Sequence, residues 1–142
     1  ITPYLGALPL PDDRGAMKHF LEALTWHTDH GDCIMIYPEA HIWPFYTGIR
    51  PFPDTSFRYP VQQKLPVFCL TNTYQRREKS HIPQIVTYLD GPFYPDAELP
   101  AKLQKTQLRD QVYEAMGKRA QNSNMEMIRY IKKDTDREKS FI

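Results

Sequence analysis

Short apolar runs bounded by turn residues constrain the fold of this chain more than any other feature of its sequence. Residues 33–37 and 66–70 are two such runs, residues 84–89 form a third apolar-rich stretch, and Pro38 directly follows the first. Continuous apolar runs of this length are typical of strands that are buried on both faces, and such strands usually belong to parallel sheets. We therefore expect three buried strands in a largely parallel sheet.

Helical patterns separate these runs. Asp12 or Asp13 can cap a helix whose apolar face repeats at three- and four-residue spacing and which should end near Gly31. A short helix can start at residues 54–56, although Pro60 limits it. A long charged helix is expected over residues 99–120, with core-facing residues Leu103, Leu108, Val112, Tyr113 and Met116.

The alternation of strands and helices favours an α/β fold with a mixed, largely parallel sheet flanked by helices. The 142 residues suit one domain with a sizeable core. We place the domain at residues 1–121. Residues 122–142 are expected to form an amphipathic and charged C-terminal tail.

Charge and cysteine content narrow the function classes. A net charge of +1 gives the whole chain no bias toward nucleic acid, so we expect no nucleic-acid partner. Cys33 and Cys69 each sit inside an apolar run, which is typical of small core residues in a reducing compartment.

No apolar stretch reaches the roughly 20 residues needed to cross a bilayer. No signal peptide is visible, and because the sequence begins with Ile1 we expect a truncated or processed chain.

Glu39 is the residue most open to a functional interpretation. It comes directly after the first predicted strand, and ligands of α/β proteins gather at the carboxyl ends of strands. Taken alone, a Glu at this place is also consistent with an ordinary solvated loop residue. The loop that follows, residues 38–53, is rich in proline and aromatic residues, which is typical of an ordered functional loop.

Four blocks of the sequence resemble the lysophosphatidate acyltransferase family of glycerolipid acyltransferases. Tyr37-Pro38-Glu39 resembles the family's Phe-Pro-Glu-Gly-Thr-Arg block, and residues 64–70 resemble its later Val-Pro-Val-like strand. Residues 6–14 stand where the family has its Gly-…-Arg block, and residues 87–95 with the helix after them resemble the end of the domain. The ordered set covers roughly residues 4–120.

The resemblance implies an O-acyltransferase of phospholipid biosynthesis. Such an enzyme moves an acyl group from acyl-CoA or acyl-carrier protein to a lysophospholipid or glycerophosphate-type acceptor, and it needs no bound cofactor. The family's general base is the histidine of a His-x-x-x-x-Asp motif that precedes the Gly-…-Arg block. We therefore expect that histidine upstream of Ile1, a fragment that is inactive alone, and an α/β domain that is incomplete at its N-terminus.

The resemblance also implies an acceptor site. Glu39 shapes it, Pro38 fixes the turn that presents Glu39, and Arg14 supplies part of the grip on the acceptor phosphate. Ala40-His41-Ile42 replaces the family's Gly-Thr-Arg, so the expected arginine is absent there. Arg50 and Arg58, which flank an aromatic loop, are either its substitutes or ordinary solvated surface residues. His41 is either an acceptor-binding residue or an ordinary solvated loop residue.

One stretch imitates the catalytic motif. His27 and Asp32 have the His-x-x-x-x-Asp spacing. They fall after the Gly-…-Arg block at residues 6–14 and before the block at residues 37–39, at an expected helix end, so we interpret the match as a coincidence. No histidine or cysteine cluster has metal-ligand spacing, and no phosphate-cradling glycine motif is present.

The aromatic loop at residues 42–46 and the membrane setting leave alternatives open. The loop either lines an acyl channel and touches the membrane or covers the sheet edge as core. The resemblance implies a membrane-surface partner and a location at the cytoplasmic face, either peripheral or anchored by an N-terminal segment. The alternative function, suggested by Ala40-His41-Ile42, is a non-catalytic lipid- or partner-binding module with the same fold.

Overall fold

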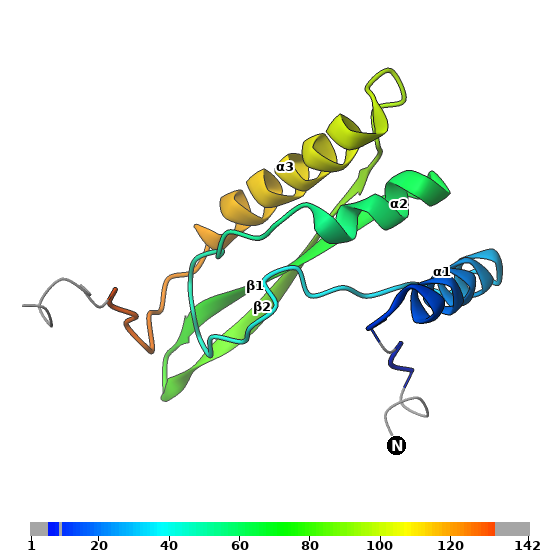
Figure 1. The fold of residues 1–142 in the computed structure, drawn as a ribbon. Helices are drawn as coiled ribbons and strands as arrows, with labels where there is room; N and C mark the ends of the chain where they lie inside the picture. The colour runs from blue at the N-terminus through cyan, green and yellow to red at the C-terminus, as the bar shows by residue number, and fades with distance from the viewer. Residues whose placement is uncertain (1–5, 9, 133–142) are drawn as a thin grey trace, which may run out of the picture. The chain divides into compact units, whose positions relative to one another are not determined.

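The structure is a computed structural model that describes residues 6–8 and 10–132. The chain divides into two compact units, Ile1–Tyr37 and Pro38–Ile142, and each is described here by itself. The first unit holds helix α1, and the second holds a short helical segment, a two-stranded sheet and helix α3 (Figure 1). The mixed α/β class expected from the sequence is confirmed.

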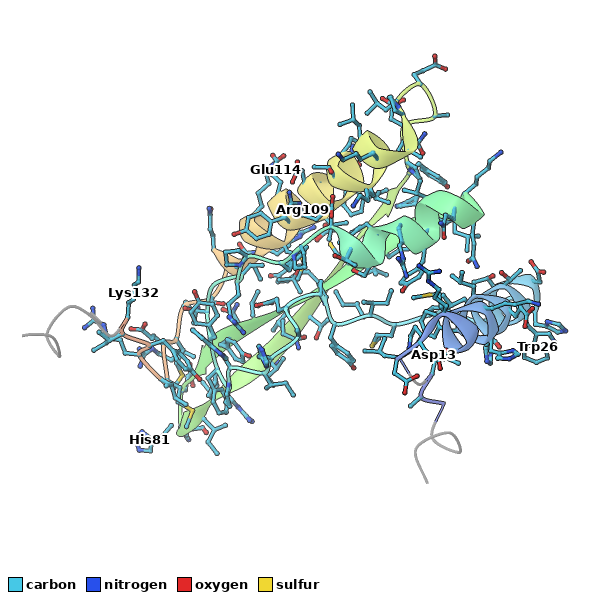
Figure 2. All side chains as sticks on the ribbon, in the orientation of Figure 1. Asp13, Trp26, His81, Arg109, Glu114 and Lys132 are labelled. Atoms are coloured by element: carbon cyan, nitrogen blue, oxygen red, sulfur yellow. The ribbon has the colours of Figure 1, made fainter. Side chains whose placement is uncertain are left out.

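Helix α1 spans Arg14–Asp29 in the first unit. Its N-cap is Asp13, whose carboxylate accepts a hydrogen bond of 2.7 Å from the backbone N–H of Ala16. The helix ends at His30, and Gly31 follows in the left-handed region with φ of 82°. Figure 2 labels Asp13 and Trp26 near the two ends of the helix. The predicted cap and helix end are therefore confirmed.

Residues 33–37 do not form the buried strand that we expected. Met35 and Tyr37 are 62% and 79% exposed, and Cys33, expected to be a core residue, is exposed too. A strand forms its backbone hydrogen bonds with a neighbouring strand and not within itself. A five-residue apolar run therefore becomes a strand only where another segment pairs with it. No described residue supplies that neighbour, and the prediction was wrong.

The sheet of the second unit is an antiparallel hairpin. Strands β1 (Val67–Arg77) and β2 (Ser80–Phe93) are joined by a two-residue turn, and Leu70 pairs with Leu89. Both strands were expected, but they extend beyond the apolar runs at 66–70 and 84–89. This pair is antiparallel, because a two-residue connection can join only antiparallel strands. The largely parallel order of the whole sheet stays a prediction. The described residues contain no other sheet.

Two helical segments flank this sheet in the sequence. A 3₁₀ turn at Thr55–Phe57 leads into the short helix α2 (Arg58–Gln63), and Lys64 then adopts a left-handed conformation. Helix α3 spans Ala101–Ala120. Both agree with the helices predicted near residue 55 and over residues 99–120.

The core of the second unit lies between α3 and one face of the hairpin. Alternate residues of β1 point toward it, and the buried apolar set consists of Phe52, Phe57, Cys69, Leu108, Val112 and Met116. Thr71 and Thr73 are buried on the same face, where the hydroxyl of Thr73 donates to the carbonyl of Val86 at 3.1 Å. The opposite face of the sheet is exposed and apolar: Phe68, Leu70, Ile85 and Leu89 are each more than half exposed.

The chain after α3 returns to the outer edge of β1. The backbone N–H of Asn124 donates to the carbonyl of Tyr74 at 3.0 Å, and the side-chain oxygen of Asn124 accepts from the N–H of Arg76 at 2.7 Å. This segment belongs to the tail that we predicted at residues 122–142. Residues 133–142 of that tail lie outside the described residues, and the domain boundary at residue 121 stays a prediction.

Candidate functional site

Glu39 lies in a tight turn at the start of the second unit. Pro38 and Glu39 form the turn, Ala40 follows in the left-handed region with φ of 61°, and the N–H of His41 donates to the carbonyl of Glu39 at 2.7 Å. A left-handed conformation is unfavourable for a residue with a Cβ atom and suits glycine best. The turn therefore holds Ala40 at an energetic cost, which is a feature often seen near functional sites.

The side chain of Glu39 is held by the far end of its own loop. One carboxylate oxygen, Oε2, accepts a hydrogen bond of 2.9 Å from the backbone N–H of Arg50. Glu39 is half-buried. A hydrogen bond from a backbone amide to a carboxylate is charge-assisted and orients the side chain strongly. The bond thus closes the loop of residues 39–50 and fixes the direction of the carboxylate.

Arg50 places a positive charge beside this loop. Its guanidinium lies 4.3 Å from the ring centroid of Trp43, within the range of a cation–π interaction. Its Nη1 atom is shielded from solvent and has no hydrogen-bond partner among the described residues. A shielded donor without a hydrogen-bond partner is energetically costly.

Aromatic rings from distant parts of the second unit surround Trp43. Tyr130 stacks on Trp43 with ring centroids 4.8 Å apart, and Tyr46 meets Tyr130 edge to face at 5.5 Å. The hydroxyl of Tyr130 donates to the carbonyl of Pro44 at 2.8 Å. The loop at residues 42–46 is therefore supported by the segment after α3, although Ile42 is 92% exposed.

Tyr74 is a member of this site that sequence analysis missed. It lies on β1, and its ring centroid is 5.6 Å from that of Phe45. Burial raises the pKa of the Tyr74 phenol, and the charges of Tyr130 and Glu39 raise it further. The phenol is thus a neutral group within electrostatic reach of the Glu39 carboxylate. Nothing in the local sequence around residue 74 separates this tyrosine from the other eight.

A shallow cleft of about 380 Å³ adjoins the same loop. The lining combines apolar groups from the loop and α3 with a few polar ones: Thr47, Ile49, Tyr113, Gly117, Ala120 and Ser123. The volume falls within the usual range of small-molecule sites. The mixed lining suits a ligand with both apolar and polar parts.

The other predicted site residues have different positions. His41 is exposed, and Arg14 is the exposed first residue of α1 in the other unit. Arg58, the second substitute, lies over the ring of Tyr59 at 4.8 Å and donates to its hydroxyl at 3.1 Å. Within the second unit the structure therefore brings together Pro38, Glu39, His41 and Arg50.

The His27–Asp32 pair forms a hydrogen bond in the first unit. The Nδ1 atom of His27 is 2.8 Å from Oδ2 of Asp32, at the end of α1. The backbone N–H of Asp32 also donates to the carbonyl of His27 at 3.0 Å, so the contact belongs to the turn that ends the helix. Helix termination is a sufficient reason for this pair to meet.

Comparisons with protein-family models, with curated proteins and with solved structures found no match. In the part of the chain that the structure describes, no group of three or more His, Cys, Asp or Glu side chains is placed to hold a metal ion. No helix in residues 6–8 and 10–132 is both long enough and apolar enough to cross a membrane.

Proposed function

We propose that this chain is part of an O-acyltransferase of phospholipid biosynthesis, of the lysophosphatidate acyltransferase family. The enzyme moves an acyl group from acyl-CoA or acyl-carrier protein to a lysophospholipid or glycerophosphate-type acceptor at the cytoplasmic face of a membrane. The observation that carries the proposal is the oriented carboxylate of Glu39, which lies in a strained turn and is tied to a loop that also presents a guanidinium.

The turn around Glu39 supports the resemblance on physical grounds. Ala40 has the left-handed conformation that favours glycine, and it stands where the family's Phe-Pro-Glu-Gly-Thr-Arg block has its glycine. An alanine in the same conformation keeps the shape of such a turn. The local backbone is therefore compatible with the family block even where the residue differs.

Arg50 supports an anionic acceptor. The family's arginine position holds Ile42 here, and an isoleucine cannot bind a phosphate. Arg50 lies at the other end of the loop, its backbone N–H donates to Glu39, and its guanidinium carries the positive charge of residues 39–50. We therefore propose that Arg50 binds the acceptor phosphate. Glu39 shapes the site next to Arg50, and the adjoining cleft binds an apolar part of the acceptor.

A larger, acyltransferase-like sheet is part of this proposal. The backbone groups of Tyr74 bond outward to residues 123–125, and backbone groups alternate in direction along a strand. The backbone N–H and C=O groups of Leu70 and Asn72 therefore point toward the same outer edge of β1. No described segment forms hydrogen bonds with them there. The apolar face at Phe68 and Leu70 is exposed as well. An open edge and an uncovered face are what a sheet lacking further strands presents.

The general base is assigned to a His-x-x-x-x-Asp motif in chain that precedes Ile1. In this mechanism the histidine takes the proton of the acceptor hydroxyl, the aspartate orients the imidazole, and the hydroxyl oxygen attacks the thioester carbonyl. The carbon–sulfur bond of the thioester breaks, the imidazolium gives the proton to the leaving thiolate, and no acyl-enzyme forms. The 142-residue chain alone is therefore expected to be inactive.

The test is an acyl-transfer assay on the full-length protein with lysophosphatidate and with a neutral lysolipid as acceptors. Glu39→Ala should lower the rate strongly, and Glu39→Gln should retain more of it, because an amide oxygen can still accept from the N–H of Arg50. The absence of transfer from any thioester donor to either acceptor by the wild-type protein would refute the proposal.

The alternative is a non-catalytic lipid- or partner-binding module with the same fold. The observation that favours it is the replacement of Gly-Thr-Arg by Ala40-His41-Ile42. A full-length sequence without an intact His-x-x-x-x-Asp motif, together with lysolipid binding but no turnover, would favour this module over the enzyme.

A further inference from the structure

We propose that one end of the second unit is a docking surface for an anionic lipid bilayer. This end, called the hairpin end below, consists of the β1–β2 turn with residues 76–79, the aromatic loop at residues 42–46 and the segment 126–132. Figure 1 shows the hairpin turn and the segment after α3 at the same end of the sheet. The proposal is independent of acyl transfer, since it concerns binding only.

Contacts hold the three parts of the hairpin end together. The N–H of Arg76 donates to Asn124, which anchors the segment after α3 to the hairpin. Further along that segment, the ring of Tyr130 stacks on Trp43 at 4.8 Å. The ring of Phe45, from the same loop, lies 5.6 Å from that of Tyr74 on β1. The hairpin end is thus one continuous surface and not three independent loops.

Bulky apolar side chains project from this surface into solvent. Ile42 and Ile131 are 92% and 83% exposed, and Trp43 and Ile128 are about 40% exposed. Because Trp43 and Tyr130 stack on each other, Ile42 and Ile131, which adjoin them in sequence, are carried on a rigid aromatic base. Exposed aliphatic side chains together with tryptophan and tyrosine are the composition that enters the boundary between lipid headgroups and acyl chains.

Basic residues outnumber acidic ones at the hairpin end. Over residues 76–79 and 126–132 the exposed cations are Arg76, Arg77, Lys79, Arg129 and Lys132, and the exposed anions are Glu78 and Glu126. Five positive and two negative charges leave a balance of +3, whereas the whole chain carries only +1. A basic surface complements the negative potential of an anionic leaflet.

The combination of features favours a bilayer over other occupants. A nucleic acid would use the basic groups but leave Ile42 and Ile131 in water. A protein groove would bury the isoleucines but would not require five cations around them. A lipid surface satisfies both, because acyl chains take the aliphatic groups while phosphates meet the arginine and lysine heads.

Vesicle binding of the 142-residue chain tests this surface. The protein would be sedimented with vesicles of phosphatidylcholine alone and with vesicles that also contain phosphatidylglycerol. We expect binding to the anionic vesicles to be at least tenfold tighter and to weaken as salt is raised. With Trp26 replaced by Phe, the fluorescence of Trp43 should shift to the blue on binding.

Matched substitutions locate the contact. Ile131→Ser should weaken binding at least threefold, and Ile42→Ser/Ile131→Ser at least tenfold. Leu10→Ser is the control, because Leu10 is also 83% exposed but lies in the first unit. Arg76→Glu/Arg77→Glu should abolish the preference for anionic vesicles even if the isoleucine variants prove poorly soluble.

Two results would overturn the proposal: equal binding to neutral and anionic vesicles, or equal loss with Leu10→Ser and Ile131→Ser. Because no donor or acceptor is present in the assay, neither result bears on whether the full-length protein transfers acyl groups.

Discussion

The carboxylate of Glu39 and the backbone N–H of Arg50 meet at 2.9 Å, so the two ends of the loop of residues 39–50 are fastened to each other. The guanidinium of the same arginine stacks on Trp43, inside that loop. Arg50 therefore has two separable parts: a backbone group that orients Glu39 and a guanidinium that lies over the Trp43 ring. Substitution of the side chain leaves the backbone hydrogen bond in place.

Under the proposed acyl-transfer function, Arg50→Met in the full-length protein should raise KM for lysophosphatidate by about tenfold to a hundredfold, which corresponds to the loss of one or two charge-assisted hydrogen bonds. KM for a neutral lysolipid should change less than about threefold, because that acceptor lacks the monoester phosphate. Steady-state kinetics with both acceptors makes the comparison. Equal changes for the two acceptors would show that Arg50 serves the loop and not the phosphate.

His27→Ala should leave the proposed acyl-transfer activity of the full-length protein within about twofold of wild type, because the proposal assigns the general base to an upstream histidine. His27 and Asp32 close the end of α1 and are not assigned to the chemistry. The rate at saturating donor and acceptor is the measurement. A fall of more than about a hundredfold would instead identify His27 as the base.

Asp54 should make the free energy of unfolding depend on pH. Hydrogen bonds from the Thr106 hydroxyl and from Lys105, at 2.7 and 3.0 Å, hold the pKa of its carboxyl below the ordinary value of 3.8. A lowered pKa in the folded state means that the stabilisation is complete well above pH 3.8 and is lost as pH falls through the lowered pKa. Asp54→Asn should therefore be less stable than wild type at neutral pH, and the difference should shrink in acid.

Urea unfolding at several pH values measures this difference. Glu114→Gln is the control: Lys118 lowers the pKa of Glu114 too, but their side chains are 69% and 72% exposed and solvent screens the pair. An effect of Glu114→Gln as large as that of Asp54→Asn would contradict the assignment of this stabilisation to the half-buried Asp54 cluster.

Leu108→Ala should lower the free energy of unfolding by about 3 kcal/mol, because Leu108 is fully buried between α3 and the hairpin and its truncation leaves a cavity. Leu103→Ala, on the same helix but 52% exposed, should change it by less than about 1 kcal/mol. Chemical denaturation of both variants tests the position of the core. Similar losses would place the core elsewhere.

Gly91→Ala should destabilise the hairpin, whereas Gly117→Ala should be neutral or stabilising. Gly91 has a φ of 127°, and a Cβ atom there would lie 2.8 Å from the carbonyl oxygen of Val67. Gly117 lies inside α3 with open space around it, where alanine is favoured by about 1 kcal/mol. Thermal unfolding of the two variants distinguishes the close contact between Gly91 and Val67 from a general effect of removing glycine. A stable Gly91→Ala variant would contradict the packing.

The sequence by itself determined the local elements of this protein. Asp13 as a cap, the end of α1 near Gly31 and the helix over residues 101–120 all follow from patterns of neighbouring residues, because helical hydrogen bonds and caps are local. The turn at Pro38 was also predicted from the sequence. The functional role of Glu39 stays a prediction. These features depend on residues within a few positions of one another.

Tertiary structure decided what depends on distant partners. Residues 71–83 are mostly polar, so the sequence did not predict that the two strands extend through them. Pairing across the two-residue turn makes β1 and β2 antiparallel. Residues 33–37 had the apolar pattern of a strand but no described partner, so they form none. Tyr74 and Tyr130 contact aromatic rings in the loop that begins at Glu39. They lie 35 and 91 positions after Glu39 in the sequence (74 − 39 and 130 − 39). Strand pairing and ring contacts form between segments far apart in the chain, and local residue patterns do not specify which segments will meet.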